Sequence, residues 1–152
     1  MAPTVALLMG SESDRERVRP AAETLEKMGV EVIWEVISAH RQPDRLRDFV
    51  REEAPSRGVE AFIAAAGMAA HLPGVVASLT NLPVIGLPLS SGGLGGLDAL
   101  LSVVQMPRGV PVAAVAVDNA VNAALLACSI LALKYAEVAQ AWKAYRESLS
   151  GG

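Results

Sequence analysis

Short, continuous apolar runs alternate along the chain with stretches in which apolar residues recur at helical spacing. Five of these runs predict β-strands, because each is rich in aliphatic residues and ends at glycine, proline or a polar residue. They span residues 4–9, 30–37, 61–65, 83–87 and 110–117. Apolar runs without polar alternation are typical of parallel strands that are buried on both faces.

The stretches between and after these runs predict helices. Apolar residues at positions 18, 21, 22, 25 and 28 indicate the first helix, which Gly29 closes as a C-terminal cap. Pro43 begins the second helix, and Pro55 and Gly58 lie beyond its expected end. Further helices are expected from about residue 73, over residues 97–104 and over residues 119–133, followed by an amphipathic C-terminal helix.

Strands that alternate with helices predict an α/β fold, in which a five-stranded parallel sheet is covered by helices on both faces. Folds of this kind bind their ligands beyond the carboxyl ends of the strands. The loops that directly follow the strands are therefore the segments in which candidate chemistry should be sought.

The charged residues are unevenly distributed along the chain. Of its 152 residues, 52% are hydrophobic but only 4% are aromatic, and 19% are charged, against a typical value of about 25%. Residues 1–60 carry 21 of the 29 charged side chains, whereas residues 61–133 carry only Asp98, Arg108 and Asp118. Composition alone leaves three explanations for so little charge: a membrane segment, an aggregation-prone sheet, or burial between subunits.

Several classes of protein are excluded. A net charge of −3 and an isoelectric point near 5.4 give no basic surface for nucleic acid. Prolines break the long uncharged run after residue 60, and the N-terminus lacks the basic region of a signal peptide, so neither a membrane span nor a leader is expected. The single cysteine, Cys128, permits no intrachain disulfide and fits a reducing compartment, and no cysteine and histidine spacing indicates a metal site.

Two loops carry residues suited to a phosphorylated ligand and to proton transfer. In GSESD (residues 10–14), serine hydroxyls and free N–H groups at a helix start suit an anion, although Ser11 and Asp14 also have the spacing of a simple capping box. In SAHRQP (residues 38–43), His40 can exchange a proton near neutral pH, and Arg41 offers a planar fork to phosphate or carboxylate. The alternative for this second loop is an exposed polar turn.

The later loops are less specific. In AGMAAHLPG (residues 66–74), small residues allow the backbone to approach a ligand closely, and His71 is either a structural hydrogen-bonding group or part of a site. SSGGLGG (residues 90–96) is either a close-packed or mobile loop or a simple connector. QMPRG (residues 105–109) precedes the fifth strand, so it should lie at the opposite edge of the sheet, in packing or in a subunit contact.

Taken together, these segments resemble the PurE family, the catalytic subunit associated with phosphoribosylaminoimidazole carboxylase. GSESD, SAHRQPD, AGMAAHLPG, GLDALLSVVQMPRGVPVA and NAALLA occur in the order and at the spacings of that family, over nearly the whole chain. The resemblance implies a single α/β domain over residues 1–152: a three-layer αβα sandwich with a flavodoxin-like, five-stranded parallel sheet and C-terminal helices. The AAHLPG form of the third loop resembles class I members, which are N5-carboxyaminoimidazole ribonucleotide mutases.

The resemblance also implies a reaction in purine biosynthesis. The carboxyl group of the substrate moves from the exocyclic nitrogen to ring carbon 4, through carbon dioxide that is released and recaptured in the pocket, without metal, ATP or another cofactor. His40 would be the catalytic proton shuttle, and Asp14 is expected at the ribose hydroxyls on charge grounds. The residues implied to bind substrate are Ser11, Ser13, Asp14, Ser38, Arg41, Gly67 and His71.

Two positions depart from the family pattern. Met68 stands where glycine is usual, so its side chain either points away from the pocket or narrows it, and Ala99 stands where serine is common. The family further implies a cytoplasmic homo-octamer that is linked functionally to an ATP-dependent N5-carboxyaminoimidazole ribonucleotide synthase. Two other functions stay open: a class II carboxylase that uses free carbon dioxide, and a non-catalytic, flavodoxin-like nucleotide-binding module.

Overall fold

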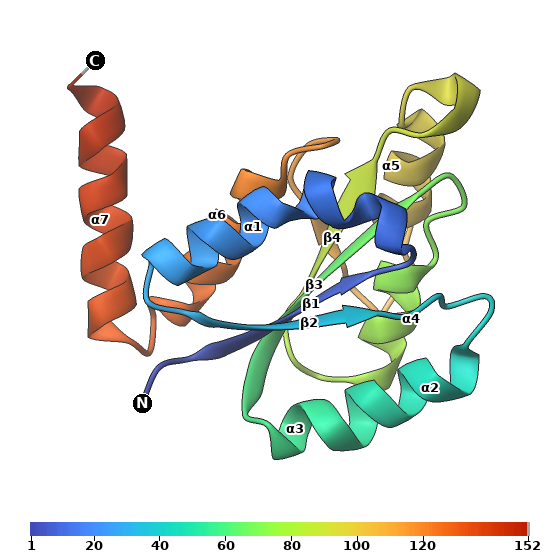
Figure 1. The fold of residues 1–152 in the computed structure, drawn as a ribbon, viewed down its shortest axis with the longest axis horizontal. Helices are drawn as coiled ribbons and strands as arrows, with labels where there is room; N and C mark the ends of the chain where they lie inside the picture. The colour runs from blue at the N-terminus through green and yellow to red at the C-terminus, as the bar shows by residue number, and fades with distance from the viewer. Residues whose placement is uncertain (152) are drawn as a thin grey trace.

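The computed structural model describes residues 1–151, which form a five-stranded parallel sheet covered by helices on both faces (Figure 1). The strands are β1 (Thr4–Met9), β2 (Glu31–Val36), β3 (Val59–Gly67), β4 (Val84–Leu89) and β5 (Ala113–Ala114). They lie in the order β2-β1-β3-β4-β5, and every pair is parallel. This is the flavodoxin-like order, so the predicted fold class is confirmed.

Two groups of helices cover the sheet. One face carries α1 (Arg15–Lys27), α6 (Ala120–Leu131) and α7 (Ala136–Ser150), and the other carries α2 (Pro43–Asp48), α3 (Ala54–Ser56), α4 (Leu72–Leu79) and α5 (Leu97–Val104). Short helices η1 (Glu12–Asp14), η2 (Phe49–Glu53) and η3 (Gly92–Leu94) precede α1, α3 and α5. Figure 1 shows α1 and α6 on one side of the strands and α2 and α3 on the other.

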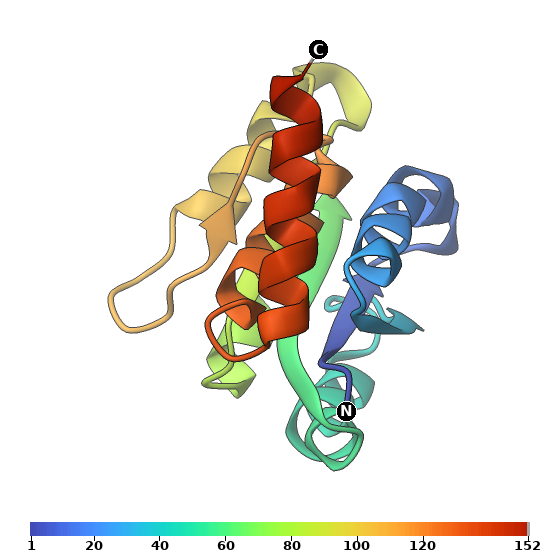
Figure 2. The ribbon, with the colours of Figure 1, turned by 90° about the vertical axis from the view of Figure 1, so that its left-hand side faces the viewer.

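Two hydrophobic cores result, one on each face of the sheet. Alternate residues of β1 show the division, since Val5, Leu7 and Met9 belong to one core and Ala6 and Leu8 to the other. All six residues of β1 are buried, as the unbroken apolar run predicts for a central strand. The helix α7 packs against α6 but buries fully only one residue, and in Figures 1 and 2 it stands at the outside of the molecule.

The fifth strand is much shorter than predicted. A strand was expected over residues 110–117, but only Ala113 and Ala114 pair with β4. Pro111 has no N–H to donate to a ladder, and Ala116 adopts a φ of +80°, outside the β region. The apolar pattern could not reveal this backbone turn.

The second helix is longer than predicted. Pro55 was expected beyond its end, but the helical path continues from α2 through η2, a π-helical turn, into α3. Pro55 lies inside this path, directly after the π-helical turn in which the N–H of Ala54 donates to the carbonyl of Phe49, and it has no N–H of its own to donate. The first helix does end as predicted, with Gly29 at a φ of +78° just beyond its C-cap. Within residues 1–151, no helix is both long enough and apolar enough to cross a membrane.

Candidate active site

A cleft of about 520 Å³ opens at the carboxyl ends of β1, β2 and β3. The connections that leave β1 and β3 run to opposite faces of the sheet, and ligands of doubly wound sheets bind at such a switch point. The cleft is lined by loops from separate parts of the chain. All of the residues predicted from the sequence for binding or catalysis line it: Ser11, Ser13, Asp14, Ser38, His40, Arg41, Gly67 and His71.

The loop after β1 presents serine hydroxyls at the start of a short helix. The hydroxyl oxygens of Ser11 and Ser13 lie 2.8 Å apart, and the N–H of Ser13 donates to Ser11 Oγ at 3.3 Å. Of the capping alternative that the spacing of Ser11 and Asp14 allowed, only a single cap forms: Ser11 caps η1, and Asp14 makes no side-chain capping hydrogen bond. Asp14 lines the cleft, and partial burial raises the pKa of its carboxyl group despite the nearby charge of Arg17.

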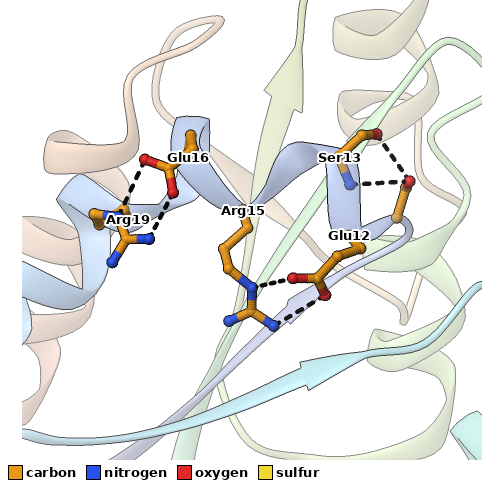
Figure 3. A network of polar contacts seen from close by, with 6 residues as sticks. Glu12, Ser13, Arg15, Glu16 and Arg19 are labelled. Atoms are coloured by element: carbon orange, nitrogen blue, oxygen red, sulfur yellow. Dashed lines mark hydrogen bonds and ion pairs between the residues drawn. The ribbon is translucent and has the colours of Figure 1, made fainter.

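Two other arginines of this region are occupied by ion pairs. Figure 3 shows Arg15 bound to Glu12 and Arg19 bound to Glu16, each pair through two hydrogen bonds. No carboxylate within residues 1–151 forms an ion pair with Arg41. Arg41 is therefore a cation of the cleft whose charge no neighbouring side chain neutralises.

A tight turn after β2 places His40 and Arg41. The N–H of Gln42 donates to the carbonyl of Ser38 at 2.8 Å, and the N–H of Arg41 donates to Ser38 Oγ at 3.3 Å. The side-chain oxygen of Gln42 accepts from the N–H of Ser38 at 3.3 Å, which closes the turn from the other side. Ser38 thus holds the turn through its backbone and its hydroxyl, and both His40 and Arg41 remain exposed to the cleft.

The two histidines of the chain meet in the cleft. His40 Nε2 lies 2.6 Å from His71 Nδ1, and the rings are arranged edge to face with centroids 4.7 Å apart. His71 directly precedes α4, so a helix start on one loop orients the imidazole of another. Because one nitrogen of the pair must donate and the other accept, the contact fixes the tautomers together and offers a path for one proton. The sequence left the place of His71 open, and the structure brings it into direct contact with His40.

The loop after β3 requires glycine and tolerates an unusual methionine. A Cβ added to Gly67 would lie 2.1 Å from Ser91 Oγ, so only glycine allows Ser91 to approach. Met68 adopts a φ of +53°, a left-handed conformation that favours glycine, and its side chain is 57% exposed. Its Cγ lies 3.8 Å from where a Cβ of Gly92 would stand. Met68 therefore lines the wall of the cleft toward the glycine-serine loop (residues 90–96).

Sequence reasoning missed two features beside the cleft. Ser91 lines it, although the sequence indicated only a close-packed or mobile loop or a simple connector for residues 90–96. Asp118, Ser90 and Arg17 form a hydrogen-bonded cluster next to that loop. The available signal was the isolation of Asp118, a lone charge after the fifth strand in an almost uncharged region.

Other expectations concern segments outside the cleft. Gly109 lines a separate cavity of about 550 Å³ together with Thr80 and Leu82, which precede β4, so this segment does lie toward the amino ends of the strands. Met106 packs against Gly74 of α4. Among residues 1–151, no group of three histidine, cysteine, aspartate or glutamate side chains is arranged to hold a metal ion.

Comparisons with known proteins agree with this arrangement. Residues 4–151 match the family model described as AIR carboxylase. The chain is 52% identical to the N5-carboxyaminoimidazole ribonucleotide mutase of Thermotoga maritima (97% of this chain, 85% of that protein). It is 54% identical to the protein of the same name from Saccharolobus solfataricus (97% of this chain, 92% of that protein). The crystal structure of Treponema denticola PurE superposes with a TM-score of 0.90 at 32% identity, covering 98% of this chain and 92% of that one.

Proposed function

The chain belongs to the AIR carboxylase family, and we propose that it is an N5-carboxyaminoimidazole ribonucleotide mutase of purine biosynthesis. It would move the carboxyl group from the exocyclic nitrogen of the substrate to ring carbon 4, giving 4-carboxy-5-aminoimidazole ribonucleotide. The observation that carries the proposal is the His40–His71 pair beside an anion-type loop in one cleft. The names of relatives about half identical over nearly the whole chain identify the substrate class.

The phosphate end of the nucleotide would lie at the loops after β1 and β2. The hydroxyls of Ser11 and Ser13 and the unpaired guanidinium of Arg41 supply donors for phosphate oxygens. The carboxylate of Asp14 would repel phosphate, so it suits ribose hydroxyls, which can donate to it. Ser38 contributes by fixing the turn that carries Arg41.

His40 would move the proton that the reaction requires. Cleavage of the nitrogen–carbon bond leaves a nitrogen that must gain a proton, and attack of ring carbon 4 on carbon dioxide leaves a carbon that must lose one. A single imidazole can serve both steps, and general acid–base catalysis of this kind contributes about 10²–10⁴-fold. His71 holds the His40 ring through the 2.6 Å contact, and with Gly67 it lines the region for the imidazole ring and the carbon dioxide.

The test is His40→Asn, which keeps a hydrogen-bonding side chain of similar size but cannot shuttle a proton. We expect turnover of the N5-carboxylated substrate to fall by at least about 10²-fold, the lower bound for acid–base catalysis. Nucleotide affinity, measured by calorimetry, should change little. Lys143→Gln, on the exposed surface of α7, is the matched control. A near-native rate in His40→Asn would contradict the assignment.

A direct carboxylase is the second candidate. The chain is also 47% identical to the phosphoribosylaminoimidazole carboxylase of Schizosaccharomyces pombe, in a match that covers 97% of this chain and 26% of the fungal protein. Supplying purified protein with aminoimidazole ribonucleotide and bicarbonate, or with the N5-carboxylated substrate at low bicarbonate, separates the two reactions. A mutase converts only the second efficiently. A non-catalytic nucleotide-binding module would convert neither.

We further propose that the enzyme is a cytoplasmic homo-oligomer, an octamer, supplied by an ATP-dependent N5-carboxyaminoimidazole ribonucleotide synthase. Exposed apolar side chains on one face of α5 support assembly, since Leu97, Leu101 and Val104 are 55%, 48% and 43% exposed at helical spacing. The charge-poor region after residue 60 includes this face. The name of a 49% identical relative in Dictyostelium discoideum, a bifunctional purine synthesis protein, supports a link to neighbouring steps of the pathway.

A further inference from the structure

A polar cluster outside the proposed binding residues joins three separate segments beside the cleft. It consists of Arg17 in α1, Ser90 directly after β4, and Asp118, two residues before α6. The N–H of Ser90 donates to Asp118 Oδ1 at 2.9 Å, and its hydroxyl donates to Oδ2. The guanidinium of Arg17 donates to Asp118 Oδ1 and to Ser90 Oγ, the latter at 3.1 Å. Both carboxylate oxygens of Asp118 are therefore used to hold Ser90.

The backbone at Asp118 is strained in a way that serves this contact. Asp118 has a φ of +59°, and Ala116, two residues earlier, has a φ of +80°. Residues other than glycine rarely adopt such conformations, which persist where surrounding contacts enforce them. The N–H of Asp118 donates to the carbonyl of Pro88 at 2.9 Å, which ties this turn to the end of β4. The strained turn thus aims the carboxylate of Asp118 at the start of the glycine-serine loop.

The loop that Asp118 holds forms one wall of the cleft. Ser91 follows Ser90 directly, and its hydroxyl lies against Gly67, within 2.1 Å of where a Cβ would stand. Gly92, which follows Ser91, has a φ of +72°, and a Cβ added there would meet only the side chain of Met68, at 3.8 Å or more. A glycine-rich segment has little conformational preference of its own, so the position of Ser91 depends on how its beginning is held.

We propose that Asp118 is a positioning residue: by holding Ser90, it keeps Ser91 at the wall of the cleft where the transferred carbon dioxide is retained. Arg17 supports it by donating to Asp118 Oδ1, which also accepts from the Ser90 N–H, and to the Ser90 hydroxyl. Ser91 lies at the Gly67 end of the cleft, which the proposed function assigns to the imidazole ring, and the inference rests on that function. A serine hydroxyl there can donate to an oxygen of the transferred group before and after its transfer.

Retention of carbon dioxide decides between two outcomes of the same first step. The nitrogen–carbon bond breaks, carbon dioxide leaves, and the nitrogen takes a proton from His40, giving aminoimidazole ribonucleotide. In the productive outcome, ring carbon 4 attacks the carbon dioxide and returns its proton to His40. In the unproductive outcome, carbon dioxide escapes and is hydrated to bicarbonate, and aminoimidazole ribonucleotide is released. If the wall is held loosely, the fraction of carbon dioxide that escapes rises relative to the fraction that ring carbon 4 recaptures.

The experiment measures this partition directly. Purified variants are given the N5-carboxylated substrate at low bicarbonate, and aminoimidazole ribonucleotide released and carboxylated product formed are both quantified, with an enzyme-free blank subtracted. Asp118→Gly removes the carboxylate, and glycine adopts the positive φ of this position without strain. The variant therefore tests the loss of the hydrogen bonds to Ser90 without adding backbone strain. Asp118→Asn keeps an acceptor for the Ser90 N–H and tolerates the same backbone. Arg19→Met, which removes an exposed ion pair elsewhere on α1, is the matched control.

We expect Asp118→Gly to raise the ratio of released aminoimidazole ribonucleotide to product by about tenfold, since a misplacement of about 1 Å at a reacting group can cost up to ~10²-fold. Asp118→Asn should fall between it and the wild type, and Arg19→Met should match the wild type. The ratio does not depend on the fraction of folded enzyme, so a purely structural defect leaves it unchanged.

If Asp118→Gly does not fold, the same ratio is measured in Ser90→Ala and Arg17→Met. These two variants leave the residues of the strained turn unchanged. A wild-type ratio in these variants, whatever their rate, would overturn the positioning role. A wild-type protein that does not convert the N5-carboxylated substrate at all would instead refute the proposed function, and the inference with it.

Discussion

Gly86, in the middle of β4, provides a sharp test of how tightly the helices pack on the sheet. It pairs with Ala64 of β3 and with Ala114 of β5, so a row of small residues crosses the sheet. A Cβ added to Gly86 would lie 2.4 Å from Val103 Cγ1 of α5, and 3.2 Å from both Pro73 Cβ of α4 and Val112 Cγ1. Real Cβ atoms do not approach other atoms as closely as 2.4 Å, so the Val103 side chain or α5 itself must shift in a Gly86→Ala variant.

The expected destabilisation follows from these distances. Overpacking of a well-filled core typically costs about 1–3 kcal/mol. Replacing glycine with alanine returns about 0.4–1 kcal/mol through the smaller entropy of the unfolded chain. The net loss should be about 1–2 kcal/mol, which for a chain of this size lowers Tm by about 2–8 °C. Thermal unfolding is to be followed by circular dichroism at matched protein concentration, because Tm depends on concentration if the protein assembles.

A matched control and a double variant make the measurement decisive. Gly93→Ala adds the same methyl group where no atom lies within 4 Å, so its stability should stay within about 0.5 kcal/mol of the wild type. In Gly86→Ala/Val103→Ala the clashing methyl groups of Val103 are absent, so the two substitutions should destabilise less together than the sum of their separate effects. Unchanged stability in Gly86→Ala, or strict additivity in the double variant, would refute the packing argument.

Three further predictions concern other parts of the chain. Burial in α6 raises the pKa of the Cys128 thiol to about 11, so iodoacetamide should label it only after unfolding; rapid labelling of the native protein, detected by mass spectrometry, would contradict this. Burial opposes ionisation of Asp118, but the hydrogen bonds from Ser90 and Arg17 outweigh it and lower the pKa of Asp118. Its carboxylate therefore stabilises the fold above the unfolded pKa of about 3.9, and this contribution is lost as the pH falls through the lower folded pKa. Tm should fall less steeply in Asp118→Asn than in the wild type below about pH 4. Leu101→Asp on the exposed face of α5 should yield smaller assemblies in light scattering, whereas a wild-type monomer at micromolar concentration would refute assembly.

Much of the fold followed from local pattern. The unbroken apolar runs identified β1 to β4 to within two residues at each end, and β3 extends two residues beyond its predicted run at both ends. The 97–104 helix has the predicted bounds. The fifth strand and the continuation of the second helix were mispredicted, because a positive φ at Ala116 and a π-helical turn leave no trace in hydropathy.

The sequence by itself determined which loops could carry chemistry. Parallel strands bring their carboxyl ends to one edge, so His40, Arg41 and the serines of the first loop had to lie near one another once the order of elements was known. Residue type then limited what they could do, since hydroxyls, a guanidinium and an imidazole suit phosphate and proton transfer.

Only the tertiary structure decided how these groups are held. Three contacts join segments that are far apart in the chain. His40 contacts His71, the Ser91 hydroxyl packs against Gly67, and Asp118 accepts a hydrogen bond from Ser90. Arg17 and Asp118 are 101 residues apart and belong to elements with no common local pattern. Hydrophobic periodicity records which face of an element is buried, but not which polar side chains meet across the loops. That information arises when the sheet order and the strained turn before α6 bring those loops together.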